Sequence, residues 1–361
     1  MSDARIGDLD RKDLASRAAG AWAERTQAAR AGRDGAVDPS LRAHFAQVQR
    51  VGGVAIATTS DGVGTKVELA ERTGVYRTLG FDLVAMVADD LAAAGVVPLS
   101  LTNVLDVDRI DPVVVDELMG GLAAACLAAD MCVTGGEIAE LGPRVGGYGT
   151  GMHLNWCATA IGTLPAGQQP LSGALLAEGD VLVGLPSPGL RSNGLTLARG
   201  VLEARFGPAW HEVASGGSTW GLRLLTPSVI YAPHLTALRL ALGDALTGCA
   251  HITGGGVPNK LGRVLRATGL GAALRAPLPP SAEIAELAAL GEVAPIDAWR
   301  VWNQGHGMIL CLRPDAVDAA LDLLAARGCP GAVIGGVVSA PGVQIWHQGP
   351  DLPPLHYRGS P

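Results

Sequence analysis

Three carboxylates stand beside glycine-rich turns or within an apolar helix, where their type and spacing suit a divalent cation. Asp61 lies in SDGVGTK after one β-rich run, Asp90 lies in LVAMVADDLAAA, and Glu137 lies in GGEIAE after a second β-rich run. Carboxylates on neighbouring elements can converge on Mg²⁺, a hard cation that prefers oxygen ligands. Each one alone could equally be a helix cap or a solvated charge, so the interpretation depends on all three together.

Asp89 directly precedes Asp90 in the same apolar segment. Successive residues of an α-helix point about 100° apart, so the two carboxylates should face different neighbours. At most one of them is therefore expected to contact a metal ion.

The turn after the first carboxylate, DGVGTK, carries a lysine among small residues. The amides of Gly62 and Gly64 can approach a phosphate closely, with Thr65 and Lys66 beside them. Lysine is scarce, occurring only at positions 12, 66 and 260, which favours a phosphate contact over a solvated turn residue for Lys66. The turn is not a P-loop, because the pattern GxxxxGK[ST] does not occur in the chain.

Two further glycine-rich loops, GLRSNG and HITGGG, each precede a predicted helix. Helix N-termini bind anions, and consecutive glycines let the backbone approach a ligand. His251 is a candidate catalytic residue, with a structural hydrogen-bonding role as the alternative. Arg191 offers a permanent charge and five donors, and is predicted to hold a phosphate or another anionic group of the substrate, unless it is a solvated surface residue. The candidate substrate-binding residues are Arg191, Ser192, Asn193, Gly254, Gly255 and Gly256.

Strands and helices are predicted to alternate along the chain, which indicates an α/β (α+β) fold with a split-βαβ first domain. Strands are expected at 54–59, 98–105, 131–134, 153–162, 181–186, 271–275, 307–312 and 332–338. Helices are expected at 5–31, 82–94 with Asp82 as N-cap, 112–129, 193–205, 227–246, 258–266 and 315–327. The Pro/Gly/Gln-rich segment 163–179 is the predicted linker. It separates residues 1–165, with a helical extension over 1–50, from a second α/β domain at 175–361.

Composition narrows the class of protein. The 361 residues are 48% hydrophobic, with a net charge of −7 and no basic run, which argues against a nucleic-acid-binding protein. The longest stretch without Asp, Glu, Lys or Arg, 145–177, is broken by proline and glycine, so no membrane span is expected. No apolar segment typical of a signal peptide follows the charged N-terminus, and the six cysteines lack C-x-x-C spacing. A cytoplasmic protein with reduced thiols is expected.

Taken in order, these motifs resemble one enzyme family. SDGVGTKVELA, GFDLVAMVADDLAAAGVVPL, TGGEIAE, GLRSNGLTLAR, LTPSVIY, AHITGGG and WNQGHGMI are similar to the phosphoribosylformylglycinamidine cyclo-ligases, or AIR synthetases, over about residues 55 to 340. The resemblance implies ATP-dependent ring closure of formylglycinamidine ribonucleotide in purine biosynthesis. It also implies a two-domain fold whose first domain pairs its sheet in a homodimer.

The resemblance assigns roles residue by residue. Asp61 and Asp90 would bind Mg²⁺ on ATP, and Thr65 and Lys66 would contact its phosphates. The full set of expected ATP-binding residues is Gly62, Gly64, Thr65, Lys66 and Glu137. Lys66 and His251 would be the catalytic residues, and the two loops described above would bind the ribonucleotide.

Several positions depart from the family pattern, and the motifs on the ATP side are kept better than those on the substrate side. Arg191 stands where the family has histidine, Asp89 where it has asparagine, and Asn103 where it has aspartate. Two alternatives therefore remain: a paralogue of the same fold that phosphorylates another small molecule, and a nucleotide-binding regulatory partner without catalytic activity.

Overall fold

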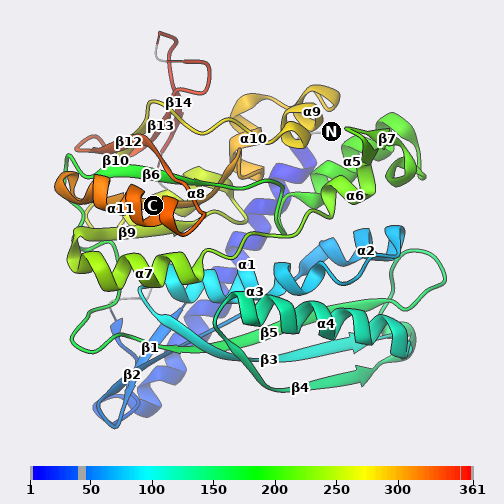
Figure 1. The fold of residues 1–361 in the computed structure, drawn as a ribbon, viewed down its shortest axis with the longest axis horizontal. Coiled ribbons are helices and arrows are strands. Elements are labelled where there is room, and N and C mark those ends of the chain that lie inside the picture. The colour runs from blue at the N-terminus through cyan, green and yellow to red at the C-terminus, as the bar shows by residue number, and fades with distance from the viewer. Residues whose placement is uncertain (1–2, 40–45, 350, 359–361) are drawn as a thin grey trace.

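Two β-sheets with helices between and around them make up the computed structural model, which describes residues 3–39, 46–349 and 351–358 (Figure 1). The first sheet lies at the bottom of the view and the second at the upper left, with α3 and α7 between them. This arrangement confirms the predicted α/β fold with two sheet-based units. None of the helices in the described ranges combines the length and the apolar composition needed to cross a membrane.

The first sheet has five strands in the order β1-β2-β5-β3-β4. β3 and β4 pair in parallel and are connected by α4, while the other neighbouring pairs are antiparallel. Buried and exposed residues alternate along β5, the pattern of a strand with one covered face and one open face. The strands are β1 (Gln47–Val51), β2 (Val54–Gly62), β3 (Val97–Val107), β4 (Cys132–Glu140) and β5 (Leu154–Thr163).

Helices cover one face of this sheet. α3 packs against β2, β5 and α4, and it is buried along almost its whole length because it also faces the second sheet. Its first residue is Leu79, so the expectation that Asp82 is the N-cap was wrong: Asp82 lies inside the first turn and is buried. The helices of this part are α1 (Asp3–Gln27), α2 (Val67–Thr73), α3 (Leu79–Ala93) and α4 (Pro112–Ala128).

The second sheet has seven strands in the order β14-β13-β10-β12-β6-β11-β9. It is antiparallel except for the parallel pair β10 and β13. Its strands are β6 (Val181–Pro186), β9 (Leu246–His251), β10 (Gly271–Leu274), β11 (His306–Leu312), β12 (Ala332–Val338), β13 (Gly342–Ile345) and β14 (Leu355–Tyr357). A small hairpin of β7 (Ala214–Ser215) and β8 (Ser218–Thr219) lies apart from it.

The helices of the second unit flank its sheet (Figure 1). They are α5 (Leu195–Phe206), α6 (Trp220–Leu224), α7 (Ala232–Leu242), α8 (Gly256–Leu265), α9 (Ala282–Leu290), α10 (Pro295–Val301) and α11 (Val317–Ala326). This unit contacts the first one through α7 and β9, which pack against α3, and through α6, which packs against α2. The helix expected over 227–246 is shorter, and β9 follows it. All six residues of β9 are buried, so the strand shows no polar alternation by which the sequence could reveal it.

Helix α1 of the N-terminal extension lies outside both cores. The described side chains of α1 from position 14 onward are nearly all exposed, including Trp22 at 66%. The extension predicted over 1–50 also holds part of β1, a strand that the sequence reasoning missed.

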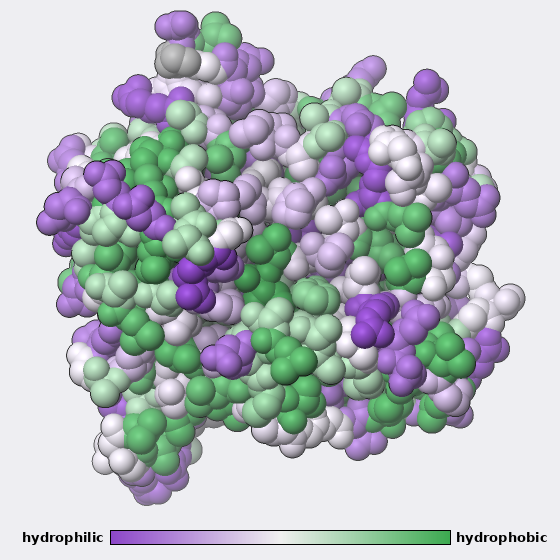
Figure 2. Space-filling model, in the orientation of Figure 1, coloured by the Kyte–Doolittle hydropathy of each residue, from purple (hydrophilic) through white to green (hydrophobic). Residues whose placement is uncertain are grey.

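On the face shown in Figure 2, hydrophobic and hydrophilic residues are interspersed; α4 crosses this face and exposes Val113 and Leu127. All six cysteines are free thiols and four of them are buried.

Candidate active site between the two sheets

Helix α3 carries the two adjacent aspartates into different surroundings, as helix geometry requires. Asp89 is fully buried and accepts the backbone N–H groups of Tyr231 at 2.7 Å and Ala232 at 2.9 Å. Asp90 turns instead toward β9, where its Oδ1 lies 2.7 Å from Nδ1 of His251. Asp89 therefore anchors the second unit at the start of α7, and Asp90 is the aspartate that faces a pocket.

Asp61 stands on β2, near enough to Asp90 and His251 for their charges to act on it. Its Oδ1 accepts the N–H of the following residue, Gly62, at 2.7 Å. Burial raises the pKa of Asp61, the Gly62 amide opposes that rise, and the nearby charge of Asp90 adds to it. The negative charge of Asp90 thus disfavours the ionisation of Asp61, and a cation between the two carboxylates would relieve the repulsion.

Glu137 lies on the opposite face of the first sheet. In the strand register, Asp61 stands beside Ala158 of β5, which stands beside Asn103 of β3 and then Gly136 of β4. Neighbouring residues across a sheet share a face, so Glu137, one position further, points the other way and is exposed. The expected convergence of three carboxylates is thus limited within one chain to Asp61 and Asp90.

The DGVGT turn is accessible, whereas its lysine is not. Gly64 and Thr65 are exposed at the end of β2, but the Lys66 side chain has no exposed surface. Its Nζ donates to Oδ1 of Asp82 at 2.7 Å and to the backbone oxygen of Thr226 at 2.6 Å. Burial lowers the pKa of Lys66, and Asp82 opposes the decrease. In this conformation the ammonium holds the first unit to the second, so a contact with phosphate, which stays a prediction, would require this pair to open.

Arg191 is also buried, not solvated. Its Nη2 lies 2.9 Å from Oδ2 of Asp89 and its Nη1 donates to the backbone oxygen of Val229 at 2.9 Å. Nη2 also lies 2.8 Å from Nε2 of His251. The residue has φ of 60°, which costs a non-glycine residue about 1–2 kcal/mol, and these contacts hold it there. The guanidinium is thus committed to protein groups in this conformation, and its predicted contact with a substrate phosphate remains untested.

The same contacts fix the tautomer of His251. A guanidinium has donors only, so Nε2 of His251 must accept from Arg191. The ring proton therefore resides on Nδ1 and is donated to Oδ1 of Asp90. His251 is consequently a residue that orients Asp90, with both of its nitrogens engaged.

The two glycine-rich loops lie side by side. A side-chain carbon at Gly254 would stand 3.1 Å from Oδ1 of Asn193, and Nδ2 of Asn193 lies near the sulfur of Met86, one helical turn before Asp90. Within the described ranges, the buried Oγ of Ser192 has no hydrogen-bond partner. Ser192, Asn193 and the exposed Gly254 therefore form a polar edge beside Asp90 that could bind a ligand.

The other two glycines of that loop are structural. Gly255 and Gly256 have φ of 92° and 64°, and a side-chain carbon at Gly256 would lie 2.0 Å from the backbone oxygen of Trp299. Only glycine allows this conformation together with this close approach. They shape the loop so that α8 starts against α10.

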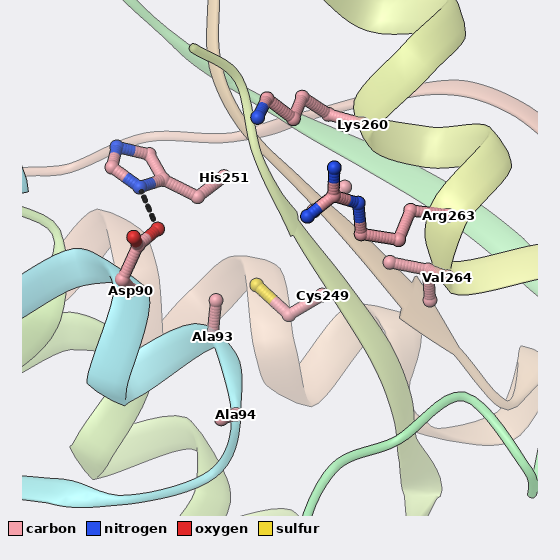
Figure 3. Close-up of a pocket in the computed structure, with 9 residues that line it drawn as sticks. Asp90, Ala93, Ala94, Cys249, His251, Lys260, Arg263 and Val264 are labelled. Carbon is pink, nitrogen blue, oxygen red and sulfur yellow. Dashed lines mark hydrogen bonds and ion pairs between the residues drawn. The ribbon is translucent and has the colours of Figure 1, made fainter. Parts of the chain in front are cut away.

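A pocket of about 30 Å³ opens between α3, β9 and α8 (Figure 3). Asp90 and His251 form one side, and Lys260 and Arg263 extend toward it from α8. The sequence reasoning did not single out these two cations. The scarcity of lysine was the available signal for Lys260, and it was applied to Lys66 instead.

The carboxylates suit a magnesium ion bound through a nucleotide. No group of three or more His, Cys, Asp or Glu residues within the described ranges is arranged to hold a metal by itself. Mg²⁺ is typically bound by one or two carboxylates together with substrate phosphates and water. Asp61, whose carboxylate is destabilised by burial and by Asp90, and Asp90 itself match that requirement.

Two family models match the chain. The model for the N-terminal domain of AIR synthase related proteins covers residues 43–163, and the model for the C-terminal domain covers residues 177–348. A phosphoribosylformylglycinamidine cyclo-ligase from Sorangium cellulosum is 39% identical over 286 residues, which is 79% of this chain and 80% of that protein. A second, from Methanothermobacter thermautotrophicus, is 37% identical over 289 residues, which is 80% of this chain and 82% of that protein.

Solved structures share the fold at lower identity. A chain of a HypE–HypF complex superposes with a TM-score of 0.63 at 18% identity, covering 90% of this chain and 96% of that one. Thiamine-monophosphate kinase from Stenotrophomonas maltophilia gives a TM-score of 0.60 at 20% identity, covering 84% and 89%. AaThiL in complex with AMPPCP and TMP gives 0.58 at 15% identity, covering 87% and 91%.

Proposed function

This chain belongs to the AIR synthase related family, and on that premise we propose that it converts formylglycinamidine ribonucleotide and ATP into aminoimidazole ribonucleotide, ADP and phosphate. The observation that carries the proposal is the identity of 37–39% to two cyclo-ligases over about four fifths of the chain. The two family models match residues 43–163 and 177–348, so the likeness extends to both units that form the candidate active site.

The reaction needs two steps that balance. The formyl-amide oxygen attacks the γ-phosphorus of ATP, the bond to the β-γ bridging oxygen breaks, and ADP leaves. An amidine nitrogen then attacks the activated carbon, the C–O bond breaks, and phosphate leaves with that electron pair while the nitrogen loses a proton. Phosphoryl transfer depends mainly on positioning and charge stabilisation, which the site's charged groups can supply.

We assign the nucleotide to the first unit. Mg²⁺, when bound, would neutralise charge on the phosphates, and Asp61 and Asp90 are the residues that would hold it. The exposed Gly64 and Thr65 lie at the end of the strand that carries Asp61, where their backbone can reach a phosphate. His251 orients Asp90 through its Nδ1 proton.

We assign the ribonucleotide to the second unit. Ser192, Asn193 and Gly254 form its polar edge, and the Oγ of Ser192 is a buried hydroxyl suited to a ligand hydrogen bond. Residues 1–165 and 175–361 would thus act as the nucleotide and substrate domains of a cytoplasmic enzyme.

A homodimer is part of the same proposal. The face of the first sheet away from α3 exposes Glu137 together with the apolar residues Val104 and Ile161. Pairing two such faces about a twofold axis would cover them and would bring Glu137 of one chain to the partner's sheet. Light scattering should then give about twice the chain mass of 36.8 kDa; a monomer with full activity would contradict this assembly.

The decisive test is product identification. Purified protein is incubated with ATP, Mg²⁺ and formylglycinamidine ribonucleotide, and aminoimidazole ribonucleotide and ADP are quantified. Equal amounts of both products support the proposal. ADP formation with another phosphate acceptor, such as thiamine monophosphate, would favour the paralogue, and nucleotide binding without any turnover would favour a regulatory partner.

A further inference from the structure

We propose that Trp302 and Asn303 are positioning residues that hold the loop 189–194 in its substrate-binding shape. That loop carries Ser192 and Asn193, to which the ribonucleotide was assigned above, so this role rests on the proposed function. Trp302 and Asn303 act on the backbone of the loop, at its two ends, and not on the ligand.

The indole of Trp302 fixes the C-terminal end of the loop. Its Nε1 donates to the backbone oxygen of Gly194 at 3.1 Å, and the residue is fully buried. Gly194 has φ of 75°, and a side-chain carbon there would stand 2.4 Å from Cδ1 of the indole. Only glycine allows this conformation together with this close approach to the ring. Because α5 begins at the next residue, the indole also sets where the loop passes into that helix.

Asn303 fixes the N-terminal end of the loop. Its Nδ2 donates to the backbone oxygen of Gly189 at 2.7 Å, and its Oδ1 accepts the N–H of Gly305 at 2.9 Å. The hydroxyl of Ser187 donates to the same oxygen of Gly189 at 3.0 Å, and the N–H of Ser187 donates to the oxygen of Gly305 at 2.9 Å. The start of the loop is therefore bonded to a short segment that lies 114 residues later in the chain.

The segment that carries both positioning residues is itself fixed. Gln304 has φ of 49°, which is uncommon for a residue other than glycine, and its backbone oxygen lies 2.8 Å from Nδ1 of His306. The N–H of Leu278 donates to Nε2 of the same ring at 3.1 Å, so the ring proton is on Nδ1 and is donated to Gln304. Burial lowers the pKa of His306 to about 4, which keeps the ring in this neutral form at neutral pH. A segment fixed in this way can impose its geometry on the loop that it contacts.

The middle of the loop is held from the opposite side. Arg191 has φ of 60°, and its guanidinium contacts Asp89 and the backbone oxygen of Val229. Ser192 therefore lies between two fixed points, Arg191 and the carbonyl of Gly194. Its Oγ is buried and has no hydrogen-bond partner in the described part of the chain, so the surrounding contacts hold it ready for a ligand. A group held in place before binding loses less conformational freedom when the ligand arrives.

The test variant is Trp302→Phe, which keeps an aromatic ring and removes the donor to Gly194. The oxygen of Gly194 still accepts the N–H of Ala198 at 3.2 Å, so α5 keeps its first turn. The matched control is Trp210→Phe, because Trp210 is also fully buried and its Nε1 has no hydrogen-bond partner among the described residues. The two substitutions remove the same atoms, but only Trp302→Phe removes a hydrogen bond to the loop.

Two measurements follow the loop. Hydrogen exchange of the peptide 187–194, without any ligand, should be about fivefold faster in Trp302→Phe than in wild type, the factor expected for one lost hydrogen bond. In steady-state kinetics, kcat/KM for the ribonucleotide should fall about fivefold, while the KM for ATP stays within about twofold of wild type. Trp210→Phe should match wild type in both measurements after correction for the folded fraction. A role in stability alone would lower the melting temperature without separating the two substrates.

A double-mutant cycle tests whether Trp302 acts through Ser192. Ser192→Ala and Trp302→Phe are measured singly and together, with kcat/KM for the ribonucleotide as the readout. The double variant should lose less than the product of the two single losses, because positioning the loop matters less once the Ser192 hydroxyl is gone. A loss equal to that product overturns the inference, since independent residues contribute additively to the free energy.

Asn303→Ala is the second variant, and it keeps the test open if Trp302→Phe does not fold. Exchange of the peptide 187–194 at the wild-type rate in these variants overturns the inference, and so does an equal loss for ATP and the ribonucleotide. If wild type forms aminoimidazole ribonucleotide and the variants behave like wild type, the positioning role fails and the proposed function stands. If wild type forms no such product while the variants still speed the exchange, the proposed function fails and the hold on the loop stands.

Discussion

Replacing Lys66 with methionine should destabilise the protein and leave nucleotide binding by the folded molecules nearly unchanged. The substitution keeps a long apolar chain but removes the ammonium that contacts Asp82 at 2.7 Å and the oxygen of Thr226 at 2.6 Å. Asp82 then stays fully buried with only the N–H and Oγ–H of Ser228 as donors. A buried carboxylate that has lost its cation is the cause of the expected instability.

Breaking a buried ion pair by removing one partner costs about 3–5 kcal/mol. For units of this size each kcal/mol lowers the melting temperature by about 2–4 °C, so Lys66→Met should melt about 10 °C lower. Adding Asp82→Asn removes the stranded charge, and the double variant should recover about 2 kcal/mol relative to the sum of the single losses.

The assay is thermal and urea unfolding, combined with the KM for ATP corrected for the folded fraction. Arg266→Met, which removes an exposed cation, should leave the melting temperature within about 2 °C of wild type, because surface substitutions cost little. An unchanged melting temperature in Lys66→Met, together with a KM for ATP raised tenfold or more, would refute the structural role and restore Lys66 as a phosphate contact.

Asp61→Asn should lower turnover about a hundredfold, on the scale of one lost electrostatic group, and near-normal turnover at saturating Mg²⁺ would exclude it as a ligand. Burial lowers the pKa of His306 from 6.5 to about 4, so its stabilising contribution, complete above pH 6.5, is lost as the pH falls toward 4. In urea unfolding, the free energy of unfolding of the wild type should fall by about 2–3 kcal/mol more than that of His306→Gln between pH 7.5 and 4.5. An equal dependence on pH in both proteins would show that His306 is not the cause. Gly256→Ala should unfold far more readily than Gly64→Ala: both positions have positive φ, but only at Gly256 would the added Cβ lie 2.0 Å from a backbone oxygen, that of Trp299. Equal melting temperatures would argue against the clash.

Local patterns in the sequence predicted many of the helices and strands and the resemblance to the family. Apolar alternation in 153–162 predicted β5, and the apolar segment with two aspartates predicted α3 with its carboxylates facing different ways. Both follow from the repeat lengths of strand and helix, which any short stretch of residues reveals. β9 escaped prediction because a strand buried on both faces has no polar alternation to display.

The partners of the charged residues depended on packing. Lys66 binds an oxygen of residue 226, and Arg191 binds Asp89, residues separated by 160 and 102 positions. No local pattern distinguishes such a cation from one that meets a ligand, because the difference is whether a carboxylate lies opposite it after folding. For that reason the glycine-rich turn around Lys66 led to the prediction that this lysine contacts a phosphate.

The sheet register decided the remaining carboxylate. A strand alternates its faces at every residue, so a change of one position moves Glu137 from the side of Asp61 to the opposite side. Sequence spacing could place each acid at a strand or helix, but only the register and the packing of α3 against β2 and β9 bring Asp61 and Asp90 together. The same packing turned Lys260, an ordinary residue of α8 in the sequence, toward them, since a helix face gains its neighbours only from the tertiary fold.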